Sequence, residues 1–588
     1  MSPRGRIDSD KVLVKELFSS RWWFRVPEYQ RPYVWGPDEI GELLEDVTYA
    51  MTESRESEYF LGSLVFQSRK ATPGNGQEYP ENDILDGQQR MATLLILFAV
   101  LRDLATNPQA KTTCQACIYQ EANPYTHIPE RTRLVFAIRD KAQVFIDEYI
   151  KPEDGTARGK DLVHLTKEAD DLSVRNMAQA IIEIRKFIQS SSIHSPELLL
   201  EYLINNVLLI YVSTEELDDA FRLFTILNDR GIPLRNSDIL KALNLGALDN
   251  RDEKVKYAKS WEEAENELGD DFDRFLGYIR TILVKDKARL SLLQEFEDKI
   301  YDPKEKDKTT GQRKPTLLSK GRDTFDLIDR YLSHYSTILG GENYKRFGNN
   351  FQFDNLVQIM RASLPATDWW PPVLRFFDKF HDDRLLEFLT RLDNKFTVDW
   401  IGQYSPTDRI EAMNAVIKSI DNAVTVEDVF NSGCFQIDGV SFIRGVDGPV
   451  YGKRFANYLL LKLDYLYHNH YLRMNVDRLT VEHILPQDPE NGSKWLSDFS
   501  SEQRVEWTNK LGNLVLITGR KNSSLGRLPY DQKKERYFKN KIDTCPNSLR
   551  VLQNYQTWTP IDLQENHTFV LKALREHYGL DTVVARGN

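Results

Sequence analysis

Cysteines and long apolar runs are scarce in this sequence, and each shortage excludes a class of protein. Four cysteines among 588 residues cannot form a disulfide framework. Only Cys114 and Cys117 are spaced like metal ligands. A zinc site would need further ligands, and the other two cysteines are remote in sequence, so we interpret Cys114 and Cys117 as incidental thiols. The apolar run from 91 to 101 is too short to span a bilayer, and no apolar signal segment stands at the N-terminus. We therefore expect a cytoplasmic protein with no membrane anchor.

Basic charge is also in deficit, with 77 Lys and Arg residues against 88 Asp and Glu residues and a formal net charge of −11. Such a chain does not coat nucleic acid uniformly, although local basic patches can still bind phosphate. The length predicts two to four domains. The composition, 41% hydrophobic and 28% charged, is that of an ordinary globular protein.

Hydrophobic periodicity predicts a mixed α/β protein that is predominantly helical. Residues 1–245 form the α/β part, with strand-like segments at 59–66 and 83–86 and a long apolar helix that begins near Gln88. A helical insertion is predicted at about 105–200. We interpret this part as one domain that ends near residue 245.

The remainder of the chain is predicted to be mainly helical. Residues 246–400 have the pattern of a helical linker region. Residues 401–588 combine helices with two short strand-like segments, 479–485 and 513–518, and with a basic helix at about 529–540. The order strand, strand, helix is the framework on which the first group of candidate site residues lies.

A carboxylate and an imidazole, Glu482 and His483, stand side by side in the first of these strands, and Asn513 and Asn522 follow. Phosphodiester hydrolysis needs a base and a cation. The imidazole suits the first task, and oxygens of Glu482 and Asn522 suit Mg²⁺. Asn513 would hydrogen-bond the other imidazole nitrogen or a nearby backbone group. Because adjacent strand residues point to opposite faces, Glu482 and His483 can share one phosphate only at a strand end or bulge.

The alternative for this group is structural: His483 caps a strand end and the asparagines serve turns. The surrounding charge favours a nucleic-acid site, because residues 501–540 hold nine basic side chains against four acids. That local balance of +5 would attract a phosphate backbone, although a solvated helix face is also compatible with it. The candidate DNA-binding residues are Arg520, Lys521, Arg527, Lys533 and Lys534.

A second group of candidate residues lies between the 83–86 segment and the long helix. Free amides at the helix start, with Arg90 one turn inside, form a natural phosphate site, and Asp86 would position a cation or polarise water. The sequence has no GxxxxGK[ST] motif, which argues against an ordinary P-loop NTPase. The alternative is a structural turn closed by a salt bridge between Asp86 and Arg90.

An aromatic cluster precedes this second group. Its members would stack on a base, such as a flipped modified cytosine, but packing in a core explains them equally well. The cluster consists of Trp22, Trp23, Phe24, Tyr29, Tyr33 and Trp35.

Together the motifs resemble the GmrSD-type modification-dependent (type IV) restriction endonucleases. Residues 482–487, 511–514 and 521–522 are similar to the HNH, or ββα-metal, nuclease domain that closes these enzymes, with a core at about 471–545 embedded in helices. By that resemblance His483 is the general base, Asn513 is the middle Asn, and Glu482 and Asn522 hold Mg²⁺ or Mn²⁺.

The N-terminal half carries the other part of the resemblance. Residues 27–35, 86–90 and 224–234 are similar to the ParB/sulfiredoxin-like domain of the same family, which includes the BREX-linked BrxU and the phosphorothioate sensor SspE. The resemblance implies that Asp86, Gly87, Gln88, Gln89 and Arg90 bind and hydrolyse an NTP (ATP, GTP or another). Gln30 and Arg31 would line the same nucleotide-binding cleft. A second motif is matched by Asn228, Arg230, Asp238 and Lys241.

The resemblance therefore implies a phage-defence enzyme. We expect it to cleave double-stranded DNA that carries hydroxymethylated, glucosylated or methylated cytosine, under NTP control. A homodimer is one option for its oligomeric state. Three alternatives stay open: a phosphorothioate-sensing nuclease or nickase, a ParB-like NTP-dependent DNA-binding protein without cutting activity, and an HNH toxin or RNase.

Overall fold

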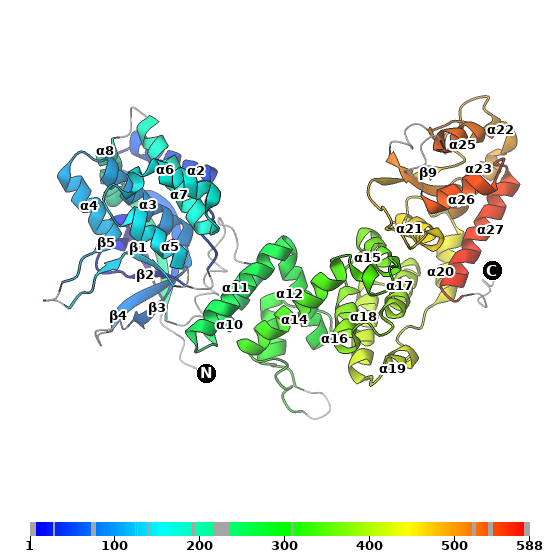
Figure 1. Cartoon of the computed structure of the whole chain (residues 1–588), viewed down its shortest axis with the longest axis horizontal. Coiled ribbons are helices and arrows are strands. Elements are labelled where there is room, and N and C mark those ends of the chain that lie inside the picture. The colour runs from blue at the N-terminus through cyan, green and yellow to red at the C-terminus, as the bar shows by residue number, and fades with distance from the viewer. Residues whose placement is uncertain are drawn as a thin grey trace. The chain divides into compact units, whose positions relative to one another are not determined.

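The computed structural model is mixed α/β and mostly helical, as the sequence predicts, and the chain forms two compact units (Figure 1). One unit comprises residues 1–269 with 320–325, and the other comprises 270–319 with 326–588. The structure describes residues 7–580 except 28–29, 72–77, 124, 126, 138–139, 191–194, 216–234, 307–310, 520–524 and 539–544.

The first unit is built on a six-stranded sheet with the order β1-β8-β3-β4-β2-β7. Neighbours β1 and β8, and β3 and β4, are antiparallel, whereas the pairs β3–β8, β2–β4 and β2–β7 are parallel. The predicted strands at 59–66 and 83–86 are confirmed as parts of β3 and β4. The strands are β1 (Ile7–Leu13), β2 (Phe24–Val26), β3 (Tyr59–Ala71), β4 (Tyr79–Asp86), β7 (Leu134–Phe136) and β8 (Val207–Thr214).

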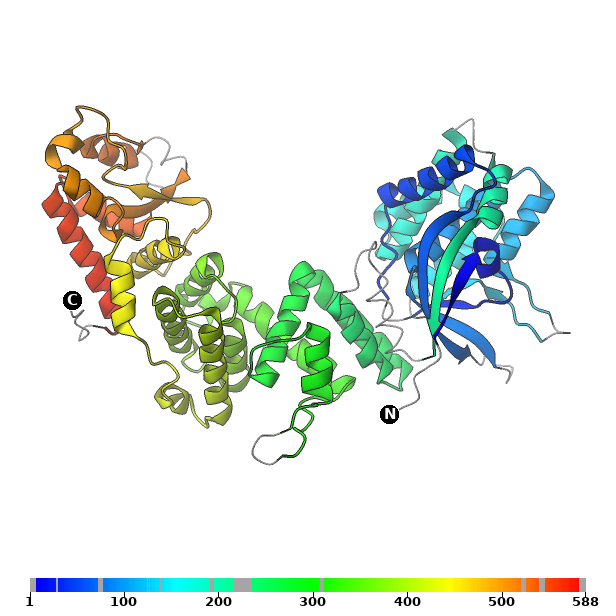
Figure 2. The ribbon, with the colours of Figure 1, turned by 180° about the vertical axis from the view of Figure 1, so that it is seen from behind.

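Helices cover one face of this sheet, and the strands are seen uncovered from behind (Figure 2). Helix α3 (Gln88–Leu104) is buried along its whole length from Met91 to Arg102, which explains its apolar sequence on all sides. The helices predicted as an insertion at 105–200 complete the same hydrophobic core. Helices α4 (Pro108–Ile118), α7 (Leu172–Ser190) and α8 (Pro196–Asn206) pack on α3, and α2 (Pro37–Glu53) packs on α7 and α8.

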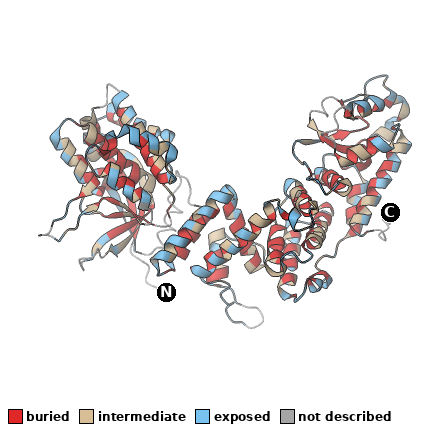
Figure 3. Cartoon of the chain, in the orientation of Figure 1, coloured by how far each residue is buried: buried red, intermediate tan, exposed pale blue. Residues whose placement is uncertain are grey.

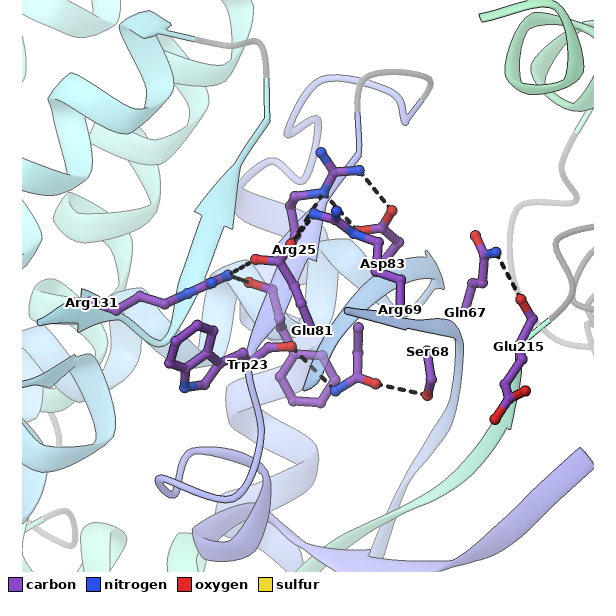
Figure 4. Close-up of polar contacts among 11 residues, drawn as sticks. Trp23, Arg25, Gln67, Ser68, Arg69, Glu81, Asp83, Arg131 and Glu215 are labelled. Atoms are coloured by element: carbon purple, nitrogen blue, oxygen red, sulfur yellow. Dashed lines mark hydrogen bonds and ion pairs between the residues drawn. The ribbon is translucent and has the colours of Figure 1, made fainter. Parts of the chain in front are cut away.

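The sheet also carries an ion-pair network across β2, β3 and β4 (Figure 4). Arg25 donates two hydrogen bonds to the Asp83 carboxylate, at 2.6 and 2.7 Å, and Arg69 Nε donates to the same group at 3.0 Å. Arg131 pairs with Glu81 at 2.5 Å, and its guanidinium lies over the Trp23 ring. Three guanidinium groups thus neutralise two buried carboxylates. The network joins β2 and β3 to β4, the strand that leads into the turn at residues 86–90.

The first unit continues past the boundary predicted near residue 245, through α10 (Asn236–Gly246) and α11 (Arg251–Leu268). The second unit begins with α-helices, as predicted for the middle of the chain. Its helices include α12 (Phe272–Val284), α15 (Gln352–Ser363), α16 (Trp370–Phe380), α17 (Leu385–Ile401), α18 (Pro406–Asn422), α20 (Gly439–Asp447) and α21 (Ala456–Tyr467). A fully buried ion pair between Lys462 and Asp393 ties α21 to α17.

The C-terminal part of the second unit contains the predicted strand, strand, helix order. Strands β9 (Leu479–His483) and β10 (Leu514–Thr518) form an antiparallel pair, and α25 (Tyr530–Phe538) is the predicted basic helix. Helices α26 (Pro546–Asn554) and α27 (Pro560–His577) complete this part. Its core holds apolar and aromatic side chains from β10, α25 and α26 and from Ile484 and Leu485, which follow β9. Figure 3 shows buried residues concentrated inside each unit.

Within the described ranges, the structure contains no helix that is both long enough and apolar enough to cross a membrane.

Candidate active site

His483 is the last residue of β9, and its imidazole is held from two sides. Its Nε2 lies 3.2 Å from Oδ1 of Asn509, which also accepts a hydrogen bond from Gln487 at 3.3 Å. The Tyr451 ring meets the imidazole edge to face, with 4.3 Å between ring centroids. Since Oδ1 can only accept, the proton sits on Nε2 and the lone pair sits on Nδ1.

The environment of His483 favours its neutral form. Burial lowers the pKa of the imidazole below its usual value, and the ammonium of Lys533 lowers it further, while the hydrogen bond to Asn509 acts in the opposite direction. A neutral imidazole is the form that accepts a proton. The residue predicted as the general base is therefore in a protonation state suited to that task.

Asn513 is fully buried, and protein groups occupy all four hydrogen-bonding positions of its side-chain amide. Its Oδ1 accepts hydrogen bonds from the Leu485 amide (2.8 Å) and the Trp558 indole (3.3 Å). Its Nδ2 donates to the carbonyl oxygens of Leu485 (2.9 Å) and Thr508 (2.8 Å). Of the two partners predicted for Asn513, the structure selects the backbone. The residue ties the chain that leaves His483 to the chain that enters β10.

Glu482 does not share a face with His483. The pairing register runs continuously through β9, with Glu482 opposite Val515 and His483 opposite Leu514. Directly opposed residues project to one face, so Glu482 lies on the core side of the strand with Val515. There its Oε1 accepts a hydrogen bond of 2.6 Å from Lys533 Nζ. β9 ends at His483, so the expected strand end is present, but no bulge separates Glu482 from His483.

Of the two side chains predicted to hold the cation, Glu482 is the one that the structure describes, and it is already paired with a lysine. Glu482 is neutralised by Lys533, and all hydrogen-bonding positions of the Asn513 amide are occupied. Among the residues that the structure describes, no group of three or more His, Cys, Asp or Glu side chains is placed to hold a metal ion. The remaining predicted ligand, Asn522, lies outside the described residues.

Three of the five predicted DNA-binding residues are described by the structure, and they differ in exposure and partners. Lys533 is only 3% exposed and points inward, which corrects its assignment as a DNA-binding residue. Lys534 donates to the Tyr555 carbonyl oxygen at 3.0 Å, and Arg527 pairs with Asp488. Arg520 and Lys521 lie outside the described residues. Of the described residues in this set, Arg527 and Lys534 are those with solvent access.

In the first unit, the strand β4 and the helix α3 meet at Asp86 and Gly87. Gly87 has a φ of +91°, and a side chain there would approach Leu64 Cδ1 to 2.9 Å. Asp86 accepts hydrogen bonds from Ser63 (3.4 Å) and Arg90 (3.5 Å). Burial raises the pKa of Asp86, and the nearby Arg90 counteracts it. Asp86 and the start of α3 are thus brought together as predicted, with the salt bridge of the structural alternative also present.

Gln30, Gln88 and Gln89 hold the loop that faces this turn. Gln30 Nε2 donates to the Leu85 carbonyl oxygen at 2.8 Å. Gln89 donates to the Pro32 carbonyl oxygen and accepts from the Val34 amide, both at 2.9 Å, and Gln88 donates to the Arg31 carbonyl oxygen. These amides therefore fix the loop at residues 30–34 beside the start of α3.

The second N-terminal motif is only partly described. Asp238, at 3% exposed, accepts hydrogen bonds from the Arg31 guanidinium at 3.1 and 3.2 Å. The buried Lys241 pairs with Glu262 at 3.3 Å. Asn228 and Arg230 lie outside the described residues. The structure thus joins Arg31 of the first motif to Asp238 of the second.

The aromatic cluster near residues 22–35 is packed into the protein core. Trp23, Phe24 and Tyr33 are at most 5% exposed, and the Tyr33 hydroxyl is 2.7 Å from the Thr93 hydroxyl on α3. Trp22 and Trp35 are partly buried against the same core, and Tyr29 lies outside the described residues. Core packing is the interpretation that these positions favour. The two spaced cysteines, Cys114 and Cys117, are also buried, which raises the pKa of each thiol to about 12.

Comparison with models of known protein families shows which family the chain belongs to. The model of the GmrSD restriction endonuclease N-terminal domain matches residues 14–245, and the model of the GmrSD restriction endonuclease C-terminal domain matches residues 444–573. The chain is a DNA endonuclease of the type IV restriction class. It belongs to the GmrSD family, because both domains are present in order and together span more than half of its length. Among curated proteins, none matches it.

Three residues of these sites were not predicted from the sequence. Asn509 and Tyr451 contact the His483 ring but are distant from it in the chain. Gly62, with a φ of +129°, lies where a Cβ would overlap the Arg90 guanidinium. A glycine inside a strand is a known sign of close approach, so Gly62 carried a usable signal.

Proposed function

We propose that this endonuclease cleaves modified foreign DNA in the cytoplasm and that His483 is the general base of the cutting reaction. The observation that carries the proposal is the hydrogen bond between His483 Nε2 and Asn509, which leaves Nδ1 as the basic nitrogen of a neutral imidazole. Only a nitrogen with a lone pair can take a proton from water.

The chemistry of the protein's own residues follows from this arrangement. Nδ1 of His483 takes a proton from a water molecule, whose oxygen attacks the phosphorus atom. The bond from phosphorus to the leaving oxygen breaks, and that oxygen takes a proton from solvent water. The imidazole becomes an imidazolium, and Asn509 Oδ1 stabilises it by accepting the Nε2 proton in a hydrogen bond. Asn513 holds the segment after β9 and the segment before β10 together, through hydrogen bonds to Leu485 and Thr508.

The proposal includes Mg²⁺ or Mn²⁺ as cofactor, with Asn522 as its expected protein ligand. When bound, such a cation supplies positive charge to the phosphate. The described geometry of Glu482 does not support a ligand role for that residue.

We further propose that the N-terminal unit binds and hydrolyses an NTP at Asp86, Gly87 and Arg90 and so controls cutting. Supporting this is the turn from β4 into α3, where backbone amides of the first helical turn, a carboxylate and a guanidinium converge. A chain with one cutting site cleaves one strand at a time, so cleavage of both strands would use a homodimer. Hydroxymethylated, glucosylated or methylated cytosine is the proposed target modification.

A digestion panel tests the proposal. Matched phage or plasmid DNAs would carry plain, hydroxymethylated, glucosylated or methylated cytosine, or phosphorothioate linkages, each assayed with Mg²⁺ and with or without NTP. We expect cutting of one cytosine-modified DNA, faster with NTP. If only phosphorothioate DNA is cut, the phosphorothioate-sensing alternative is favoured. DNA binding without cutting would favour a ParB-like DNA-binding protein. Equal cutting rates with and without NTP would contradict NTP control.

A further inference from the structure

We infer that Glu482 and Lys533 form a buried clamp that fixes the catalytic strand to helix α25, and that Glu482 is a positioning residue rather than a ligand of the cation. The inference rests on the proposed function insofar as His483 is the base that the clamp positions. It departs from the role that the sequence motif suggests for Glu482.

The clamp is defined by two hydrogen bonds from one ammonium group. Lys533 Nζ donates to Glu482 Oε1 at 2.6 Å and to the main-chain carbonyl oxygen of His483 at 2.8 Å. The first bond joins the α25 side chain to the core side of β9, and the second joins it to the backbone of the catalytic residue. Lys533 therefore holds the peptide unit that follows the His483 Cα, on the side of the strand away from the imidazole.

Both charged groups are enclosed. Lys533 is 3% exposed and Glu482 is 6% exposed, and the apolar side chains of Ile484 and Val515 lie beside them. A charge in such surroundings is stable only with a partner. If Glu482 turned away to bind a cation elsewhere, Lys533 would be left as a buried cation that lacks its carboxylate.

The space on the core side is also too small for the predicted cofactor. The cavity lined by Glu482 and Lys533 has a volume of about 20 Å³. A cavity of that size holds about one water molecule, whereas Mg²⁺ bound by proteins keeps several of its waters. A hydrated cation at Glu482 would require both the loss of the ion pair and the displacement of packed side chains.

Variants of the pair separate a clamp from a ligand. Glu482→Leu and Lys533→Met each leave one buried charge without its partner, so we expect each to lower the Tm and the cutting rate. The double variant Glu482→Leu/Lys533→Met replaces the pair with apolar side chains of similar volume, which is often tolerated in a protein interior. We expect its Tm to return above those of both single variants, and its cutting rate to recover to within about tenfold of the wild type.

The control is the exposed pair Arg527–Asp488 in the same part of the chain. Arg527→Gln/Asp488→Asn should leave the Tm unchanged, since exposed ion pairs contribute little.

The dependence of cutting on Mg²⁺ concentration is the readout that a ligand role would change. For a clamp, the Mg²⁺ concentration that gives half-maximal cutting is the same in the wild type and the double variant. The inference would be overturned if this Mg²⁺ concentration rose about tenfold or more in the double variant. It would also be overturned if the double variant were no more stable than the less stable single variant. The Tm comparison needs no catalysis, so a wild type that fails to cut DNA would count against the proposed function and leave the clamp testable.

Discussion

Asn509 and His483 are 26 positions apart in the chain, and one hydrogen bond between their side chains determines which imidazole nitrogen can react. The main-chain carbonyl oxygen of Asn509 also accepts hydrogen bonds from the amides of Val450 (2.8 Å) and Tyr451 (3.2 Å). Asn509 therefore positions the His483 imidazole through its side chain and the backbone of Tyr451 through its carbonyl oxygen. The Tyr451 ring packs against the same imidazole.

Substitution of Asn509 by Ala should lower kcat and leave the KM for DNA nearly unchanged. The imidazole would lose the acceptor that fixes its tautomer, and loss of such an orienting partner typically costs about 10- to 100-fold. Single-turnover and steady-state cutting assays measure the two constants. Gln487→Ala is the matched control, because Gln487 contacts the same oxygen from an exposed position and its loss should have a smaller effect. A change confined to KM would contradict the positioning role.

The pH dependence of cutting should reflect a lowered pKa for His483. Burial and Lys533 both favour the neutral ring, so the pKa in the folded enzyme lies below its ordinary value. The base stays active at neutral pH, and kcat/KM should fall only as the pH drops below about 6.5.

Lys533→Met removes the positive charge that helps to lower this pKa. The acidic limb of the profile should therefore move to higher pH in that variant, measured at a temperature where the variant is folded. A limb that stays in place, or moves to lower pH, would show that Lys533 does not act on the imidazole.

Asn513→Ala should destabilise the second unit more than Asn509→Ala does. Four buried hydrogen bonds end on the Asn513 amide, and buried groups left without partners cost about 1–3 kcal/mol each. Urea unfolding of the full chain, followed by tryptophan fluorescence, gives the comparison. Equal stability of the two variants would mean that the surrounding chain rearranges to replace these bonds.

Gly87→Ala should weaken both the first unit and its response to NTP. The residue has a positive φ, and the added Cβ would meet Leu64, so the strain should cost about 1–3 kcal/mol. Calorimetry and an NTP hydrolysis assay measure the two effects. Gly159→Ala is the control, because Gly159 starts a helix and a Cβ there meets nothing within 4 Å. If both variants behave like the wild type, the turn at Gly87 is not under steric constraint.

Local pattern was enough to predict most elements near the two sites. Short apolar segments predicted β9 and β10, and the apolar run after Gly87 predicted α3, because such patterns depend only on neighbouring residues. The opposite faces of Glu482 and His483 also follow from strand alternation. Of the two irregularities expected here, a strand end or a bulge, the structure has the strand end at His483 and no bulge.

Residues whose roles depend on tertiary contacts were predicted less well. Lys533 was grouped with exposed basic residues, yet it lies on the same helical stripe as Tyr530 and Tyr537, and these three are the buried residues of α25. Helical spacing could have assigned it to the core. Asn509 offered no comparable signal, because it lies in a turn and its partner His483 is 26 positions away on β9.

The most direct test of the account is the single-turnover rate at which His483→Ala cuts a DNA substrate that the wild type cleaves, with DNA binding measured in parallel. Loss of a general base typically lowers the rate about 10²- to 10⁴-fold. We expect a loss in that range with DNA binding retained. Cutting at the wild-type rate by the folded variant would contradict the assignment of His483 as the base.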